Sequence, residues 1–501
     1  MSAINNLRDS APAAEHDARV LPLQRGPGVT VLSEDELARL DAAALGVLEE
    51  TGIEVRGGAV LERLGAAGAE IDTETRRVRF PRSLAEEALR LPPRELLLAG
   101  RDPACDLRVD GTAGWLSTGG HATEIIDPET GDRRPSTGAD LAAVSRLADA
   151  VPHIGFVGAS VTVLDVPPSA RPLHELYVQF ANTSKHVQLM AAADARDARA
   201  AVEIGRIIVG DERQLRERPV LSALVRSRSP LAHEGGVLEA AVAFAEAGVP
   251  CGFVAMPVGS ATSPVTAAGS LVAASAEVLA GVVALQLLVP GAASFCGARA
   301  RTADGTGSEA TSAGPEGLLF LMASAELAHR HGLPVHVGTF ATGAKTPDWQ
   351  AGLAGGLSIF ASWLSGADML GDAGLLGDGR AFSAAEMLLD TELFDLVRQI
   401  PLGFEVDEEA LAVEVIEKVG PGEHFLGEPH TIRHMREAWA SRFMGKDTWE
   451  AWEETGRPEP SSRAAERARE LLASHEPEPL APGVEERIRE VIVEREHDTA
   501  G

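Results

Sequence analysis

The chain has 501 residues, of which 45% are hydrophobic and 24% charged, enough for one large barrel with additions or for two to three ordinary domains. Its net charge of −29 and its isoelectric point near 4.9 argue against nucleic acid and anionic membranes as partners. Three scattered cysteines argue against a disulfide framework, and the lack of a signal-peptide core or of an uncharged membrane-spanning stretch predicts a cytoplasmic protein.

The N-terminal part of the chain predicts a lead-in followed by helices. Residues 1–28 are polar and rich in proline and alanine, which indicates a disordered lead-in. Ser33 and Glu36 form a capping box that opens the first helix. Further short helical segments and a hairpin at residues 96–111 follow. We therefore assign residues 29–112 to an N-terminal helical and hairpin prologue that serves packing.

From residue 113 a pattern repeats, in which a short apolar strand is followed by a polar or glycine-rich loop and an Ala/Leu-rich helix. Eight such units, with connections long enough for parallel pairing, predict an α/β fold, a TIM (β/α)8 barrel over residues 113–380. A doubly wound sheet would give similar units, so it is the count of eight units that favours the barrel. No GxGxxG motif or P-loop follows any strand, which leaves nucleotide binding with little support. The predicted strands are residues 115–119, 156–163, 186–191, 219–225, 250–256, 292–297, 334–340 and 367–371.

The chain becomes helical again after the barrel. Residues 381–455 predict a C-terminal helical cap that contains a glycine-rich loop. Residues 456–501 predict a charged helical tail with proline-rich links, either an outer helix or a partly disordered extension.

The seventh predicted strand leads into a polar loop that holds Lys345, Asp348 and Gln350. Lysine is rare in this chain, and barrels build their active sites from the loops that follow the strands. These three residues are therefore candidate catalytic residues. The alternative for Lys345 is an ordinary solvated side chain.

Polar and sulfur-bearing residues also follow other strands. His121 follows the first, and its glycine-rich approach makes it a further catalytic candidate, with an ordinary loop histidine as the alternative. The remaining strand ends contribute a mixture of cationic, anionic and soft apolar groups. No Ser-His-Asp spacing or nucleophile elbow is present, so acyl transfer has no support. These further strand-end candidates are Arg226, Met256, Arg299 and Asp372.

His430 and His434 are four residues apart and can share one face of a helix. The segment is no HExxH motif, and no cysteine or carboxylate lies at ligand spacing beside the pair. We expect capping or packing histidines here and no metal site.

Four stretches are distinctive: GSATSPVTAAGSLVAASAEVLAGVVALQLLVPGA, GPEGLLFLMASAELAHRHGLP, AKTPDWQAG and GPGEHFLGEPHTIRHMREAW. Together they resemble the trimethylamine methyltransferase (MttB-like) superfamily, and the likeness spans about residues 30–455. Only standard residues are present, so the chain is similar to the branch without pyrrolysine, which includes glycine betaine methyltransferases. The resemblance implies a TIM barrel that moves a methyl group from a quaternary amine to the cobalt of a separate corrinoid protein. The cobalamin would be supplied by that partner and not permanently bound.

A quaternary ammonium ion favours an aromatic cage with a balancing carboxylate. Phe340 and Trp349 form the preferred pair, because both lie near the mouth of the seventh strand; for most of the aromatic candidates core packing is the expected role. A betaine carboxylate would bind Arg226, Arg299 or Lys345. Asp348, Asp372 or Glu277 would balance the ammonium, although Glu277 lies mid-helix and could simply brace the barrel. The other aromatic candidates are Trp115, Phe156, Tyr177 and Phe253.

Two alternatives keep the barrel. One is a non-catalytic protein that binds quaternary amines, and the other is a metal-dependent TIM-barrel hydrolase that uses His121, His430 and His434. The expected partners are a small methylated amine and a corrinoid protein, and a barrel with long helical additions also predicts a homo-oligomer.

Overall fold

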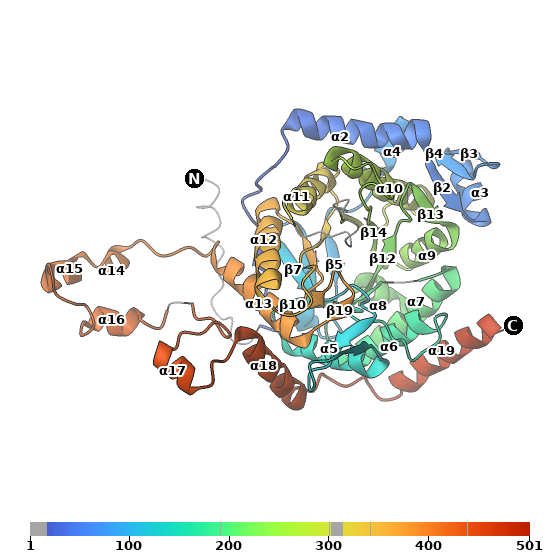
Figure 1. Cartoon of the computed structure of the whole chain (residues 1–501). Helices are drawn as coiled ribbons and strands as arrows, with labels where there is room; N and C mark the ends of the chain where they lie inside the picture. Colours follow the sequence, from blue (N-terminus) through green and yellow to red (C-terminus); the bar gives the residue numbers. More distant parts are fainter. Residues whose placement is uncertain are drawn as a thin grey trace.

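Eight parallel strands form the centre of the molecule, with helices around them (Figure 1). The computed structural model describes residues 18–190, 192–299, 301, 314–340, 342–437 and 439–500. Strands that are neighbours in the ring pair in parallel, β17 returns to β7, and a bridge between Cys296 and Val335 joins β15 to β16. The predicted TIM barrel is confirmed. Its strands are β7 (Ala113–Ser117), β10 (Ile154–Gly158), β11 (His186–Leu189), β12 (Leu221–Arg226), β14 (Cys251–Ala255), β15 (Ser294–Ala298), β16 (His336–Gly338) and β17 (Met369–Gly371).

The strands are near-continuously apolar because both of their faces are covered. All five residues of β14, for example, are buried. The covering helices are α5 (Gly138–Ala150), α6 (Arg171–Asn182), α7 (Ala195–Val209), α9 (Gly235–Glu246), α10 (Ala267–Leu288), α11 (Pro315–Arg330), α12 (Trp349–Ser365) and α13 (Ala384–Gln399). By length and composition α10 would suffice to cross a membrane, but 72% of its most apolar window is buried inside the protein.

A hairpin closes one end of the barrel. Its strands β5 (Leu96–Leu98) and β6 (Leu107–Val109) place Leu98 and Leu107 in one apolar cluster with the barrel residues Leu224 and Phe295. The amide of Ala99 donates to the carbonyl of Pro219, which lies just before β12, so the hairpin covers the N-terminal ends of the strands. Only the C-terminal end is left for a site, as in other TIM barrels.

The prediction of a disordered lead-in is wrong for residues 18–28, and residues 1–17 lie outside the described part of the chain. Strand β1 (Leu23–Gln24) pairs antiparallel with β7, and the Leu23 side chain is buried. The amide of Leu21 also bonds to the carbonyl of Pro152. Burial of these leucines outweighs the polar composition of the segment.

The prologue that follows packs against α10 (Figure 1). Its first helix, α2 (Glu34–Gly46), begins with the predicted capping box of Ser33 and Glu36. A small sheet completes the prologue; it contains β2 (Ile53–Arg56), β4 (Arg77–Arg79), β3 (Glu70–Asp72) and, from the barrel region, β13 (Ala232–Glu234), with helices α3 (Gly58–Ala66) and α4 (Arg82–Ala88) beside it.

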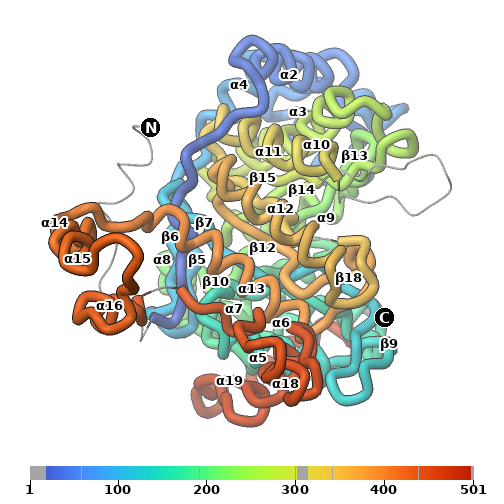
Figure 2. The backbone as a smooth tube through the Cα atoms, turned by 60° about the vertical axis from the view of Figure 1, so that its left-hand side comes forward, coloured from blue at the N-terminus to red at the C-terminus, as the bar shows by residue number. Residues whose placement is uncertain are grey.

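The region predicted as one cap over residues 381–455 divides into two parts. Helix α13 packs against α12 as part of the wall around the barrel, whereas the chain after it stands away from the body (Figure 2). This arm, residues 404–437, carries α14 (Glu408–Leu411), α15 (Val413–Val419) and α16 (Pro429–His434). After the short α17 (Trp449–Glu454), the predicted charged tail folds back, with α18 (Pro460–Ser474) on α13 and α5 and α19 (Val484–Ala500) on α7 and α6.

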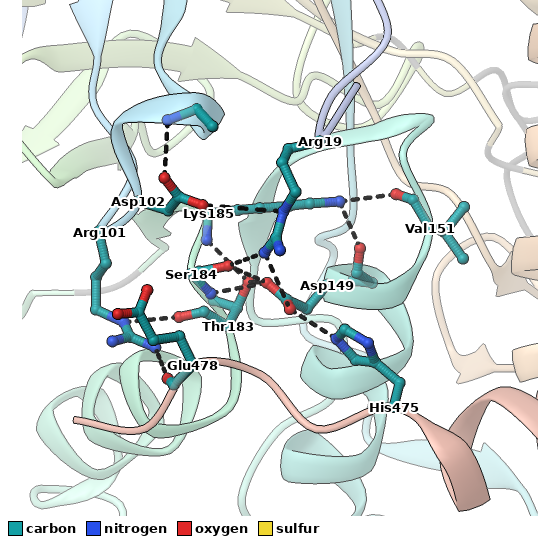
Figure 3. A network of polar contacts seen from close by, with 12 residues as sticks. Arg19, Arg101, Asp102, Asp149, Val151, Thr183, Ser184, Lys185, His475 and Glu478 are labelled. Atoms are coloured by element: carbon teal, nitrogen blue, oxygen red, sulfur yellow. Dashed lines mark hydrogen bonds and ion pairs between the residues drawn. The ribbon is translucent and has the colours of Figure 1, made fainter. Parts of the chain in front are cut away.

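A polar network at the closed end joins both chain ends to the barrel (Figure 3). Lys185, fully buried at the start of β11, donates to three backbone carbonyls. Asp149 accepts hydrogen bonds from Ser184 and contacts His475, which follows α18, at 2.7 Å. Arg19 donates to Ser184 from the N-terminal side. Buried polar groups with this many partners fix the register between distant segments.

Candidate functional site

The open end of the barrel carries three charged side chains. Strand residues two positions apart share a face, so Arg226 follows the interior residue Leu224, and Arg299 follows Phe295 by two such steps. Arg299 Nη1 donates to Asp372 Oδ2 at 2.6 Å, and both side chains are nearly buried. Arg226 has no hydrogen-bond or ion-pair partner among the residues that the structure describes. Counted over these three side chains, one positive charge is present beyond the Arg299–Asp372 ion pair.

The electrostatics of Arg226 reflect this enclosure. Its side chain is reached by solvent, yet desolvation by the surrounding protein lowers its pKa. The carboxylate of Asp372 opposes that change, and the guanidinium of Arg299 adds to it. An arginine stays charged under such conditions, so Arg226 is a cation with no counter-ion of its own within the described part of the chain.

The Arg299–Asp372 pair occupies space that only glycine leaves open. A Cβ atom on Gly338 of β16 would lie 2.7 Å from Asp372 Oδ2 and 2.9 Å from Arg299 Cδ. Asp372 itself has a φ of +75°, a conformation that few residues other than glycine adopt. The strained backbone and the missing side chain together hold the ion pair across the barrel mouth.

Below the ion pair lies a half-buried histidine, His336 on β16. Its ring meets that of Phe156 edge to face, with centroids 6.3 Å apart. Burial lowers the pKa of His336, and Asp372 opposes the shift. His336 was not among the predicted site residues, although a histidine inside an apolar strand is a signal that the sequence offers.

His121 lies at the same end, with its backbone at a φ of +54°. Its Nε2 is 3.2 Å from Glu175 Oε2 on α6, and Glu175 in turn accepts the amide of Val163. A cavity of about 360 Å³ opens between His121, Met190 and Arg226, and apolar residues of β11, β12, α6 and α9 complete its wall. Met190 Sδ would be 3.4 Å from a Cβ on Gly158, so glycine again makes room.

The loop after β16 lies further out than predicted. Asp348 is the N-cap of α12, and its carboxylate accepts the amides of Gln350 and Ala351. Lys345 is exposed and lies beside Gly377. Gly377 belongs to the turn between β18 (Leu375–Leu376) and β19 (Ala381–Phe382). Gln350 borders a second cavity of about 390 Å³, between α11 and α12, whose wall also includes Arg299 and Gly338. The structure thus gives Asp348 a structural role, and only Gln350 borders the same space as the mouth residues.

The six predicted aromatic residues do not form one cage. Trp115 lies in the cluster at the closed end, where its indole donates to the carbonyl of Arg108, and Phe156 lies in the barrel interior. Tyr177 on α6 bonds Glu485 of α19. The three others also point elsewhere: Phe253 fills the notch at Gly281 of α10, Phe340 is buried against Gly355 of α12, and Trp349 is 78% exposed.

Packing explains why the predicted aromatic cage does not form. The helices around the barrel are rich in alanine and glycine, so the few large side chains are needed to fill the layer between strands and helices. Phe253 and Phe340 do so, because each fits against a glycine of the helix that it faces.

Glu277 is also outside the mouth. It is buried on α10 and accepts hydrogen bonds from Ser227, Ser229 and the amide of Leu231. Burial raises the pKa of this carboxyl, and these donors oppose the shift. Of the two roles considered for Glu277, the structure supports the brace, since it holds the loop that follows Arg226. Met256, directly after β14, remains near the mouth because it continues the interior face of Val254.

The three histidines of the hydrolase alternative are separated. His121 is paired with Glu175 at the barrel, whereas His430 and His434 lie on α16 in the projecting arm. Because the three rings belong to different parts of the molecule, the structure contradicts a shared metal site among them.

A profile of the trimethylamine methyltransferase family, MTTB, matches residues 4–500. The chain belongs to this family. Trimethylamine methyltransferase MttB of Desulfitobacterium hafniense is 33% identical over 473 residues, covering 94% of this chain and 95% of the relative. A glycine betaine methyltransferase of Desulfitobacterium hafniense is 30% identical, covering 94% of this chain and 98% of the relative. Membership confirms the resemblance seen in the sequence and makes the protein a methyltransferase.

Solved structures agree on the fold of this trimethylamine methyltransferase family member. The crystal structure of the Methanosarcina barkeri monomethylamine methyltransferase MtmB superposes with a TM-score of 0.50. It is 12% identical and covers 89% of this chain and 88% of that chain. At this identity the likeness concerns the fold alone.

Proposed function

We propose that this methyltransferase moves a methyl group from a betaine-like quaternary amine to the cobalt of a corrinoid protein. The observation that carries the proposal is the charge at the mouth, where Arg226 has no partner among the described residues and lies beside the Arg299–Asp372 pair. A site with a spare guanidinium favours a substrate that carries a carboxylate as well as an ammonium group.

The chemistry of such a donor suits the residues present. When a methyl group leaves a quaternary nitrogen, the C–N electron pair stays on nitrogen, and a neutral tertiary amine departs without needing a proton. The protein's contribution is then to bind the carboxylate at Arg226, align one methyl and exclude water. The sulfurs of Met190 and Met256 offer soft, polarizable surfaces for the methyl groups.

We assign the acceptor to a separate corrinoid protein that docks over the open end and brings its own cobalamin, which this chain does not hold permanently. The closed N-terminal end supports this direction of approach, because the β5–β6 hairpin covers it. Reduced cobalt is strongly reducing, which together with three buried, unpaired cysteines supports a cytoplasmic location.

The deciding experiment follows methyl-cobalt absorbance under anaerobic conditions, with Co(I)-cobalamin or the corrinoid partner and a panel of glycine betaine, choline and trimethylamine. We expect turnover with the carboxylate-bearing amine. Arg226→Gln should lower its kcat/KM by about 10- to 100-fold, the equivalent of one charged hydrogen-bonded contact. Arg228→Gln is the matched control, since that arginine pairs with Glu234 outside the mouth.

Two results would overturn the proposal. Faster turnover with trimethylamine or choline than with glycine betaine would remove the role of Arg226 as a carboxylate site. Saturable binding of the amines with no methyl transfer to either acceptor would instead support the alternative of a non-catalytic protein that binds quaternary amines.

We also propose that the protein self-associates. The exposed side of α12 carries the apolar residues Trp349, Leu353, Leu357 and Phe360 at helical spacing, of which Leu353 and Leu357 also border the cavity between α11 and α12. Such a stripe on the wall of a barrel suits contact with a second copy. Light scattering should give a mass above that of one chain, and Trp349→Glu with Phe360→Glu, two exposed residues that do not border that cavity, should reduce it; a monomeric wild type would refute the proposal.

A further inference from the structure

The projecting arm, residues 404–437, has no core of its own. None of these residues is buried, and its three helices have four to seven residues each. Figures 1 and 2 show it standing away from the barrel. Helices this short are unstable without tertiary support, and small segments that lack a core are commonly held by a metal ion or a disulfide. The described residues of the arm contain no cysteine.

Three side chains in the arm converge. Glu409 lies in the first turn of α14, and His430 and His434 lie one turn apart on α16. One potential ligand atom from each lies within 4.8 Å of the others, and the two imidazole centroids are 4.4 Å apart. The fold thus supplies the carboxylate that the sequence around the histidine pair lacks.

The ring of His434 is held in place by carboxylates on both of its nitrogens. Its Nδ1 lies 2.8 Å from Glu437 Oε2, whereas its Nε2 faces Glu409 Oε1 at 3.3 Å. A carboxylate on one ring nitrogen with the other nitrogen directed at the ion is the usual arrangement around metal-binding histidines. His430 Nε2 lies 3.0 Å from the carbonyl oxygen of Glu409, which keeps that ring beside the same residue.

We propose that Glu409, His430 and His434 form a divalent transition-metal site, suited first to zinc, that fastens α16 to α14. Two histidines and a carboxylate are a zinc ligand set, with a water molecule in the fourth position. Ligands of tetrahedral zinc lie about 3.3 Å apart, so atoms now within 4.8 Å need only side-chain adjustment to close on an ion.

The charge of the arm favours a cation as well. Residues 404–437 contain nine acidic and three basic side chains. The guanidinium of Arg433, which bonds Glu409 Oε1, is the one competing cation next to the cluster among the described residues. Glu409 keeps a second oxygen, so arginine and metal ion can share it. Because His121 stays with Glu175 at the barrel, the site has a structural role and not a part in methyl transfer.

The test uses the full-length chain after removal of any affinity tag and of metal by a chelator. Titration with Co²⁺, followed by visible absorbance, and then with Zn²⁺, followed by elemental analysis, should give one ion per chain. Glu409→Gln and His434→Gln should each lose this binding by at least about 10-fold. His424→Gln is the matched control, because His424 is exposed in the same arm but lies outside the cluster.

Limited proteolysis gives a second readout that does not depend on activity. Zinc should protect the arm from cleavage in the wild-type chain and in His424→Gln, and not in Glu409→Gln. None of the substituted side chains is buried, so the thermal transition of the body should stay unchanged. Failure to bind one ion per chain, or binding that Glu409→Gln and His434→Gln leave intact, would overturn the proposal.

Discussion

Replacing Lys185 by methionine tests whether the network at the closed end stabilises the protein (Figure 3). The ammonium group is fully buried and donates to the carbonyls of Ala148 at 2.8 Å, Val151 at 2.7 Å and Ile154 at 2.6 Å. Burial lowers its pKa to about 8, so the group is still charged at neutral pH. Methionine keeps the length of the side chain and removes the three donors and the charge.

The expected loss of stability follows from the groups that lose their partner when Lys185 is replaced. Three carbonyl oxygens lose a charged donor, and Asp149, whose pKa is lowered in spite of its burial, loses a nearby cation. Breaking such a buried charged network costs about 3–5 kcal/mol. The entropy of unfolding scales with chain length, to about 1 kcal/mol per degree for a chain this long, so the Tm should fall by about 3–5 °C.

Scanning calorimetry at pH 7 measures this change, with Lys446→Met as the control, since Lys446 is exposed. The KM for the amine should stay unchanged, because Lys185 lies at the end of the barrel opposite the mouth. A Tm of Lys185→Met within about 1 °C of the wild type, or an equal fall in the control, would refute the reasoning.

Two further predictions concern the open end and its surroundings. Gly338→Ala places a methyl group 2.7 Å from Asp372 Oδ2, so the ion pair must shift and kcat/KM should fall by about 10-fold or more, whereas Gly352→Ala, with nothing within 4 Å, should leave kcat/KM unchanged. Burial raises the pKa of Glu386 to about 8, so the folded chain holds a proton that the unfolded chain releases above its ordinary pKa. Stability from this group is therefore lost as pH rises from about 5 to 8, and Glu386→Gln should flatten the dependence of Tm on pH in that window; an unchanged slope contradicts the assignment.

Much of the fold could be predicted because a barrel strand is covered on both sides and leaves an unbroken apolar run. All eight predicted strands overlap observed ones, from β7 to β17. The arm and the N-terminal strand β1 could not be predicted, since neither has a periodic pattern. Strand β1 has two residues, and no described side chain of the arm is buried. Short elements of this kind depend on contacts with distant parts of the chain.

The site divides in the same way. Arg226, Arg299 and Asp372 could be found because the C-terminal ends of parallel strands meet at one end of a barrel. The separation of the six aromatic residues could not be predicted, because composition does not say which face of a strand a ring occupies. Phe253 has the opposite parity to the interior residue Val254 and so faces α10. Glu175 was missed because it lies on a helix, far in sequence from the strand-end residue His121 that it approaches.

The two ends of this barrel therefore have different chemistry, and that difference constrains how transfer can occur. At the closed end Lys185 donates to three backbone carbonyls and Asp149 contacts His475, so these buried charges need no ligand to balance them. At the open end Arg226 has no described partner, so an anionic group that binds there gains an interaction without displacing an existing one. In the proposed reaction the hairpin blocks the other route, so the amine and the methyl acceptor would use the same opening, the amine first and the acceptor over it. Loops at this end would then recognise both proposed partners, and a substitution there that lowers transfer to the corrinoid protein should be compared with its effect on amine binding alone.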